Sequence, residues 1–500
     1  MNLQSLWTRA CGRLLRMGGP EVKPRKKRPR IAPTRHRRIE WLERREVMTA
    51  SFGSAVDIGG SGSDAVFDVA VDFAGNSYAT GYFSGTVDFD LSHSLADNAD
   101  ILASRGTHDA FVAKYAPDDS LIWVRRMGGD YLYEVSVTDA ARDITVDSVG
   151  NVYVAGEFHE TADFGGTTLT AVGGKDSFAT KLSGNGDFLW AKRWGTTEND
   201  QSDGADVDGQ GNFYVVSRQG DGDYDILKYS SSGSEVWTRS LIGTYWVPAD
   251  LAVSSSGSVY VAGTFDGTVD FDPSAKTKNV SAGLMTAAFV LNLDAAGKFK
   301  WVTPFVGKTV NGSNGYAFAA SVAVDNSGGV VVGGLYRNTV DFNPSSSTTT
   351  LNPVGGAYIA RLNGTGGLSW AKTLTNAGSG GYTSTTALAV DASGSIYVAG
   401  GFAGSIDLDP GTPSLIHSTN GDTDVFVVKL TASGNFVWGE TFGGVRSESA
   451  LGIDVASNGD VYVAISYADQ VDFDPSPLDS YLVGSPGAAR NGLRLRLLQS

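Results

Sequence analysis

A short acidic segment recurs six times along the chain and carries the residues best suited to binding a metal ion. Its clearest copy is TVDFDP, residues 268–273, in which Asp270 and Asp272 are two positions apart. Carboxylates at this spacing suggest calcium, which takes about six to eight oxygen ligands. The candidate calcium ligands, in four of the copies, are Asp88, Asp90, Asp270, Asp272, Asp407, Asp409, Asp472 and Asp474.

The spacing of the segments favours a structural role over a binding loop. In every copy the first carboxylate follows an earlier strand position by ten residues, as Asp270 follows Tyr260. A paired strand cannot slip by one residue without exchanging its faces, whereas a loop varies freely in length. Valine and phenylalanine alternate with the carboxylates, and Asp-Pro is typical of a turn. We therefore favour a short, half-buried strand with its acidic side toward water, and keep calcium as the alternative.

Differences among the copies support the same preference. The second carboxylate is replaced by Gly165 in the second unit and by Asn343 in the fifth, so a calcium site would be uneven. The third unit lacks the segment, because only nine residues separate Ser217 from Ile226. The segment is therefore an accessory to a repeated core. Insertions that fall on one face of a repeat array often mark its binding face.

The repeated core consists of four segments with period-2 alternation, rich in Val, Tyr, Phe and Trp and separated by Gly, Asn, Asp and Ser turns. In the second unit these segments are 143–150, 151–156, 176–182 and the stretch around Trp190. Four short strands repeated seven times predict an all-β, seven-bladed β-propeller with four-stranded antiparallel blades. We expect one tryptophan of each unit to pack between adjacent blades: Trp123, Trp190, Trp237, Trp301, Trp370 and Trp438.

The repeat resembles the SBBP-type β-propeller repeat family. The resemblance is carried by a D-x-A-V-D…G-N-x-Y-V-x-G core and by later D-x-F-V-x-K-L and W-x-x-x-x-G-G motifs, and it extends over residues 50–500. It implies a fold and no activity. The Asp residues of the D-x-x-G stretches belong to turns, since Asp and Gly suit turn geometry. They are Asp72, Asp147, Asp208, Asp325 and Asp391.

The seventh unit lacks its fourth strand, because no tryptophan segment follows residues 492–498 before the chain ends at Ser500. The missing strand is available at the other end of the repeats. Residues 50–60, ASFGSAVDIGG, alternate like a strand and end in a Gly-Gly pair. We predict that this N-terminal strand pairs with residues 493–497 and closes the ring, which removes exposed sheet edges. Ser54 occupies the position of the missing tryptophan.

Charge divides the chain into a basic head and an acidic body. Residues 1–49 contain 14 Lys or Arg and 4 Asp or Glu, a net charge of +10, and the remainder contains 25 and 50, a net charge of −25. Nucleic-acid binding requires a concentrated basic face, so this body argues against it. The stretch KPRKKRPR, residues 23–30, is the one place where a nucleic-acid or nuclear-localisation patch stays open. No run of apolar residues is long enough to span a membrane.

The head resembles the N-terminal segment of many exported planctomycete proteins. The resemblance covers residues 35–50, where Leu42, Glu43 and Arg45 match a Leu-Glu-x-Arg core that small apolar residues follow. It implies export to the cell surface or beyond. The predicted organisation is thus a disordered, export-type head over residues 1–49 and a monomeric propeller over 50–500. The single cysteine, Cys11, lies in the head, so the body forms no disulfide.

The sequence contains little that supports catalysis. The five histidines occupy no shared position of the repeat, and no HxxxH pair, GxSxG elbow or P-loop occurs. The expected innermost strands consist mostly of Val, Ala and Ile, which suits crowding near the axis. We therefore expect a non-catalytic, exported or cell-surface propeller without a cofactor, which binds a protein or glycan or acts as a scaffold. The alternative is an enzyme whose site is built from loops, a lyase or hydrolase acting on polysaccharide.

Overall fold

The computed structural model describes most of the body of the chain. The described residues are 50–90, 100–130, 139–220, 222–241, 246–343, 348–351, 355–376, 381–474, 482–483 and 491–499. The predicted head, residues 1–49, lies outside them. All regular elements in the described residues are strands. None of these residues forms a helix that is long and apolar enough to cross a membrane.

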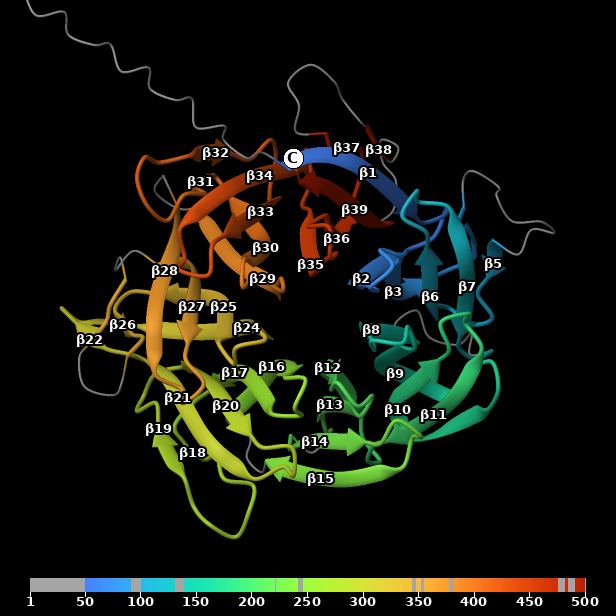
Figure 1. The fold of residues 1–500 in the computed structure, drawn as a ribbon, viewed down its shortest axis with the longest axis horizontal. Helices are drawn as coiled ribbons and strands as arrows, with labels where there is room; N and C mark the ends of the chain where they lie inside the picture. The colour runs from blue at the N-terminus through green and yellow to red at the C-terminus, as the bar shows by residue number, and fades with distance from the viewer. Residues whose placement is uncertain are drawn as a thin grey trace, which may run out of the picture. The chain divides into compact units, whose positions relative to one another are not determined.

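Seven antiparallel sheets of four strands form a ring around a central axis, as predicted (Figure 1). Blade 1 contains β2 (Ala65–Val71), β3 (Ser77–Phe83), β6 (Asp109–Tyr115) and β7 (Leu121–Met127). Blade 2 contains β8 (Ala140–Val146), β9 (Val152–Asp163), β10 (Thr168–Leu182) and β11 (Phe188–Trp194). Blade 3 contains β12 (Gln201–Val207), β13 (Phe213–Arg218), β14 (Tyr224–Tyr229) and β15 (Glu235–Leu241).

The remaining blades repeat this order, with the innermost strand first. Blade 4 contains β16 (Trp246–Val253), β17 (Val259–Phe265), β20 (Ala287–Leu293) and β21 (Phe299–Gly307). Blade 5 contains β24 (Tyr316–Val324), β25 (Val330–Arg337), β27 (Gly356–Leu362) and β28 (Leu368–Asn376). Blade 6 contains β29 (Tyr382–Val390), β30 (Ile396–Ala403), β33 (Asp424–Leu430) and β34 (Phe436–Gly444). Blade 7 contains β35 (Ser449–Val455), β36 (Val461–Tyr467), β39 (Asn491–Gln499) and β1 (Ala50–Ile58).

The ring closes as the sequence predicts, through pairing of the first strand with the last. β1 runs antiparallel to β39 from Ala50 opposite Gln499 to Ile58 opposite Gly492. Ser54 lies opposite Arg496, in the register in which Trp123 lies opposite Lys114 in blade 1. The closing strand therefore occupies the tryptophan strand's place, with a small polar residue where the large ring belongs.

The hydrophobic core lies between neighbouring blades, and the tryptophans contribute to it as predicted. Four of the six are buried, while Trp301 and Trp370 are half-buried. Five of the six indoles donate a hydrogen bond from Nε1 to a turn carbonyl of the next blade, as Trp123 does to Gly184 (3.2 Å). Trp438 finds no acceptor among the described residues. The reason is that the third and fourth strands of blade 7, β39 and β1, are the last and first strands of the described chain, so they are not joined by the short turn that supplies the acceptor in the other blades.

The recurring acidic segments form short strands, which confirms the structural interpretation. Most pair with a second short strand in a hairpin: β4 (Thr86–Asp88) with β5 (Ile101–Ala103), β18 (Thr268–Asp270) with β19 (Asn279–Ser281), β31 (Ser405–Asp407) with β32 (Ile416–Ser418), and β37 (Val471–Asp472) with β38 (Leu482–Val483). The copy in blade 5 is β26 (Val340–Asp341), and the copy in blade 2 lies at the end of β9. A separate hairpin joins β22 (Thr309–Val310) to β23 (Ser313–Asn314).

Most of these segments link one blade to the blade before it. The segments of blades 5, 6 and 7 pair with the outer strand of the preceding blade, as Asp341 does with Val306. In blades 1 and 2 a single bridge makes the same link, for example between Val87 and Gly60. The apolar side chains seal the contact, because residues such as Val87 and Phe89 are only 1% exposed.

The carboxylates of the segments mainly accept hydrogen bonds from backbone amides in turns. This corrects the expectation that the acidic side of each segment faces water. Asp270 Oδ1 accepts hydrogen bonds from the backbone N–H of Asp272 (3.1 Å) and of Lys278 (2.7 Å). The first carboxylates of the other copies also accept from the residue two positions on. Two members of the set, Asp90 and Asp341, are buried. Such local bonds to backbone amides are typical of Asp in turns.

Candidate functional site: the acidic channel and its mouth

A cavity of about 410 Å³ runs along the axis of the ring. It is lined by the innermost strands of all seven blades, which are β2, β8, β12, β16, β24, β29 and β35 (Figure 1). These strands each have one unpaired edge, because their blades continue only outward. The edge leaves backbone N–H groups that need partners from elsewhere.

Apart from Asp203, five carboxylates line this channel, where mostly Val, Ala and Ile were expected from the sequence. They are Asp68, Asp143, Asp206, Asp250 and Asp454. Each accepts a hydrogen bond from a backbone N–H on the innermost strand of the next blade. The pairs, at 2.7–3.1 Å, are Ile144 to Asp68, Ala205 to Asp143, Val253 to Asp206, Val322 to Asp250 and Val71 to Asp454.

The channel carboxylates therefore satisfy the free edges and join successive blades. In blade 5 the hydroxyl of Ser321 takes this role and accepts from the N–H of Leu388 (3.1 Å). Blade 6 has only Ala387 and Ala389 at the corresponding positions, so no side chain there reaches blade 7. A signal for the carboxylates was present in the sequence, in the Asp that opens DVAV, DITV and DLAV, but their partners lie in other repeats.

Burial raises the pKa values of the channel carboxyls. Protein surrounds them on every side, although each keeps partial contact with the cavity. Burial raises the pKa of Asp206 and Asp250 to about 7 and that of Asp454 to about 6. Burial, followed by the neighbouring Asp143 carboxyl, raises the pKa of Asp68 well above its ordinary value. Around neutral pH the ring thus holds a mixture of protonated and ionised groups.

We expect the channel to make the protein less stable as the pH rises from about 4 to about 7. In this range the folded carboxyls still hold protons that the unfolded chain, with a pKa of about 3.9 for Asp, has released. The folded state then binds more protons, and its stability falls with increasing pH. Asp250→Asn removes one such group and keeps an acceptor for Val322, so the free energy of unfolding should fall less with increasing pH in the variant than in the wild type. Urea unfolding at pH 4.5 and 7.5 measures these free energies. An equally large fall in the variant would contradict the prediction.

A β-bulge interrupts every innermost strand at the same position and places one extra residue at one mouth of the channel. The seven bulged residues are Phe67, Arg142, Asp203, Ala249, Ala320, Thr386 and Leu451. All seven line the cavity. Bulges are frequent beside binding sites because they re-aim a side chain. Only blades 1 to 3 present a large aromatic or charged residue at this position.

The mouth lies at the rim that carries the acidic segments. Both the segments, between second and third strands, and the connections between blades lie at the end of the blades where the innermost strand begins. The bulges interrupt the innermost strands near this same end. We call this end the insert rim. Its inner part, over blades 1 to 3, is the candidate functional site.

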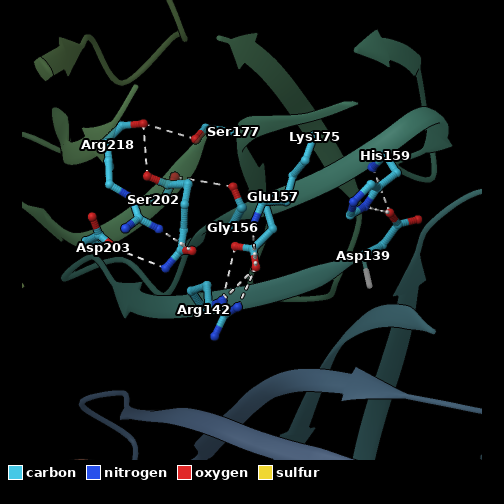
Figure 2. Close-up of polar contacts among 12 residues, drawn as sticks. Asp139, Arg142, Gly156, Glu157, His159, Lys175, Ser177, Ser202, Asp203 and Arg218 are labelled. Atoms are coloured by element: carbon cyan, nitrogen blue, oxygen red, sulfur yellow. Dashed lines mark hydrogen bonds and ion pairs between the residues drawn. The ribbon is translucent and has the colours of Figure 1, made fainter. Parts of the chain in front are cut away.

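A network of ion pairs organises blade 2 at this mouth (Figure 2). The guanidinium of Arg142 donates to both oxygens of Glu157, with Nη2 to Oε1 at 2.6 Å. Lys175 Nζ lies 3.8 Å from the same carboxylate. His159 donates its backbone N–H to Asp139 (2.8 Å). Burial alone would lower the pKa of Arg142, but the facing Glu157 carboxylate raises it.

Blade 3 adds a second set of polar groups to the network (Figure 2). Gln201 donates from Nε2 to Asp203 (3.0 Å) and accepts from the guanidinium of Arg218 (3.1 Å). Burial raises the pKa of Asp203 to about 6, although Arg218 and Arg142 lower it. The mouth thus contains one carboxylate paired with an arginine, Glu157, and a second, Asp203, whose pKa burial raises to about 6.

Aromatic rings border the network on the side of blade 1. The guanidinium of Arg142 lies over the ring of Phe67, 4.5 Å from its centroid. Phe67 contacts Tyr82 with centroids 5.5 Å apart, and Tyr82 contacts His108 edge-on at 5.0 Å. Phe67, Tyr82 and His108 are half-buried, so each ring keeps accessible surface. An Arg stacked on an aromatic face fixes both groups.

The structure distributes the predicted calcium candidates around the ring, one pair to each of four segments, and does not bring different pairs together in one site. Within the described residues no cluster of three or more His, Cys, Asp or Glu side chains could hold a metal ion. The D-x-x-G carboxylates lie in turns as predicted. Asp72, for example, accepts from Asn76 and from the hydroxyl of Tyr78.

Comparison with known proteins agrees with the propeller architecture. Residues 122–157 match the SBBP beta-propeller repeat. The match extends from β7 of blade 1 into β9 of blade 2. No curated protein has a significantly similar sequence.

Solved structures similar to the chain have low sequence identity. A protein of unknown function from Bacteroides caccae is 12% identical, covering 66% of this chain and 89% of its own, with a TM-score of 0.33. The Pan2 WD40 domain from Neurospora crassa is 10% identical over 89% of this chain and 97% of its own, with a TM-score of 0.40. Sqt1 from Chaetomium thermophilum is 11% identical over 91% and 100%, with a TM-score of 0.35.

Proposed function

We propose that the protein is a non-catalytic binding module, exported or held at the cell surface, that recognises a neutral glycan at the channel mouth over blades 1 to 3. The observation that carries the proposal is the set of bulged residues. Seven equivalent positions surround the mouth, and three adjacent ones hold Phe67, Arg142 and Asp203, while Ala249 and Ala320 leave space opposite. The export part rests on the resemblance of residues 35–50 to exported proteins.

The balance of charge at the mouth favours a neutral ligand. The cations Arg142, Lys175 and Arg218 equal in number the carboxylates Asp139, Glu157 and Asp203. The closest of these pairs, Arg142 with Glu157, already satisfies its own charges. A strongly anionic ligand would also meet the net charge of −25 on residues 50–500.

The chemical groups at the mouth match a polyhydroxylated ligand. Sugar hydroxyls both donate and accept hydrogen bonds, and the mouth offers donors from Arg142 and Gln201 beside the acceptor Asp203. The partly exposed rings of Phe67 and Tyr82 offer an apolar surface for a sugar's C–H face. Sites that combine a few fixed polar groups with aromatic surface are typical of small-molecule recognition.

The binding proposal is tested with neutral oligosaccharides. Calorimetric titration with cello-, xylo-, manno- and chitohexaose should reveal binding to at least one of them. Phe67→Ala and Asp203→Asn should each weaken that affinity at least about tenfold, or about 1.4 kcal/mol. Thr386→Ala, at the equivalent bulge of blade 6, is the matched control and should bind as the wild type does. Circular dichroism confirms that each variant is folded.

Two results would overturn the proposal. One is the absence of binding to every neutral hexamer, combined with binding to a sulfated or uronic-acid oligosaccharide. The other is binding of a neutral hexamer that Phe67→Ala, Asp203→Asn and Thr386→Ala all leave unchanged, because the ligand would then lie elsewhere.

A second candidate function, cleavage of a polysaccharide, is favoured by one observation. Glu157 forms an ion pair with Arg142, whereas burial raises the pKa of Asp203 to about 6. A carboxyl with a pKa near 6 suits a general acid, and glycoside hydrolysis commonly uses such a group together with a second carboxylate. Release of reducing ends from the bound oligosaccharide, lost in Asp203→Asn while binding persists, would establish this alternative over simple binding.

A further inference from the structure

A three-residue pattern recurs at the insert rim where successive blades meet. An acidic residue lies in the third strand of one blade, six residues before the strand's last residue. A glycine lies at the end of the outer strand of that blade, and a second acidic residue directly precedes the innermost strand of the next blade. At seam 1–2 these residues are Asp109, Gly128 and Asp139. At seam 2–3 they are Asp176, Gly195 and Asp200, and at seam 6–7 they are Asp424, Gly443 and Glu448.

The glycine is present because the first carboxylate occupies the place of a side chain. A Cβ on Gly128 would lie 2.6 Å from the carboxyl carbon of Asp109, and a Cβ on Gly195 would lie 2.8 Å from that of Asp176. At seam 6–7 the contact with Asp424 would be closer still. The three seams therefore hold a buried carboxylate in the same packing arrangement.

Two of these seams supply an arginine for the first carboxylate. Arg126 Nε lies 3.5 Å from Asp109 Oδ2, and Arg193 forms an ion pair with Asp176. Both arginines lie opposite the phenylalanine two residues after the Asp. In blade 6 the residue opposite that phenylalanine, Phe426, is Thr441. Its hydroxyl lies 3.0 Å from Nδ1 of His417 and brings no charge.

Among the residues that the structure describes, seam 6–7 has two buried carboxylates and no cationic side chain paired with them. Asp424 is 2% exposed and Glu448 is 0% exposed. Each uses one oxygen: Asp424 Oδ2 accepts from the N–H of Asn420 and Glu448 Oε2 from the N–H of Gly444, both at 3.0 Å. The other oxygens, Asp424 Oδ1 and Glu448 Oε1, have no hydrogen-bond partner within the described residues. Isolated buried charges and unpaired polar atoms are costly, so a partner is expected.

We propose that seam 6–7 binds a calcium ion between Asp424 and Glu448, in place of the guanidinium that the equivalent seams contain. Hard cations prefer oxygen ligands, and calcium tolerates irregular geometry better than magnesium does. Because only two side chains take part, backbone carbonyls and water complete the coordination. The proposed ligands differ from the carboxylates of the recurring acidic segments, although the segment of blade 7 pairs with Gly443 and Gly444 at this same seam.

Seam 6–7 also lacks two polar contacts that join neighbouring blades elsewhere in the ring. An ion bound there would therefore stabilise the attachment of blade 7 to blade 6. Blade 6 contributes no side chain to the channel contacts with blade 7, where it has Ala387 and Ala389. Trp438, whose indole faces this seam, has no acceptor in the described part of the chain, unlike its five counterparts. The closing blade is therefore held on this side by fewer polar contacts, and calcium should strengthen its attachment.

The test measures thermal unfolding of the full chain after removal of calcium with EDTA, followed by titration with calcium to 10 mM and, separately, with magnesium. We expect the Tm of the wild type to rise with calcium and much less with magnesium, since binding to the folded state alone stabilises it. Glu448→Gln should lower the calcium affinity at least about tenfold, because affinity depends on ligand charge. Thr441→Arg should raise the Tm in EDTA and remove the response to calcium.

Two control variants locate the ion. Asp270→Asn with Asp272→Asn alters one of the acidic segments and should keep the response of the wild type. Asp422→Asn removes an exposed carboxylate near the seam and should do the same. The proposal is overturned if calcium leaves the wild-type Tm unchanged, if Glu448→Gln responds as the wild type does, or if the double variant abolishes the response.

Discussion

Removal of residues 50–60 is expected to destabilise the whole ring. β1 supplies the outer strand of blade 7 along the full length of β39, from Ala50 opposite Gln499 to Ile58 opposite Gly492. Its loss exposes the edge of β39 and uncovers Leu493, Leu495 and Leu497, which are all fully buried. We expect the free energy of unfolding to fall by at least about 5 kcal/mol, which is comparable with the entire stability of many domains, about 5–15 kcal/mol. Differential scanning calorimetry of the deletion variant and the full chain measures this loss of stability.

Deletion of residues 1–46 is the matched control for this experiment, because it shortens the chain and retains β1. This shorter variant should unfold at the temperature of the full chain. A synthetic peptide spanning residues 47–60 should restore part of the Tm of the strand-deleted protein. Equal melting temperatures for the two deletion variants would show that β1 does not close the ring.

Replacement of a buried tryptophan is expected to cost about 3–5 kcal/mol, the usual range for a large aromatic residue in a core. In Trp123→Ala the cavity would open between blades 1 and 2. The indole contacts Tyr78 edge-on with centroids 6.1 Å apart and donates to Gly184 (3.2 Å). Gly186 leaves room for the ring, since a Cβ there would lie 2.8 Å from it. Urea unfolding gives the free-energy difference directly.

Two comparisons separate packing from hydrogen bonding in this prediction. Trp301→Ala should cost less, below about 3 kcal/mol, because Trp301 is only half-buried. Trp123→Phe loses the bond to Gly184, whereas Trp438→Phe loses no bond to a described residue, since the Trp438 indole has no acceptor among them. Affinity for a glycan, measured per folded molecule, should be unchanged in all four variants. Equal costs for Trp123→Ala and Trp301→Ala would show that burial between blades does not set the effect.

Several features of the architecture were predictable from the sequence because they depend on spacing along one repeat. Period-2 alternation determined the strands, and the ten-residue interval identified TVDFDP as a paired strand, since a paired strand cannot slip without exchanging its faces. The incomplete seventh unit and the alternation in residues 50–60 together predicted the closure. The position of Ser54 opposite Arg496 follows from the same register.

The channel and its mouth depended on contacts that repeat spacing does not encode. The Asp residues at the start of the innermost strands were visible in the sequence, but Asp68 meets Ile144 from the next blade, 76 residues away. A β-bulge has no clear sequence signal in this chain, so nothing singled out Arg142 and Asp203 as channel-lining residues. Their roles follow from the ring, which brings the same position of every blade to one axis.

The seam between blades 6 and 7 shows the same division between sequence and tertiary structure. The sequence alone determined that Thr441 replaces an arginine found at this position in two other units. Only the folded ring decided that this change leaves Asp424 beside Glu448 with unpaired oxygens, because the two residues belong to different blades. Local periodicity determines which residues form strands and turns. Burial and charge pairing between blades arise only when distant strands are brought into contact.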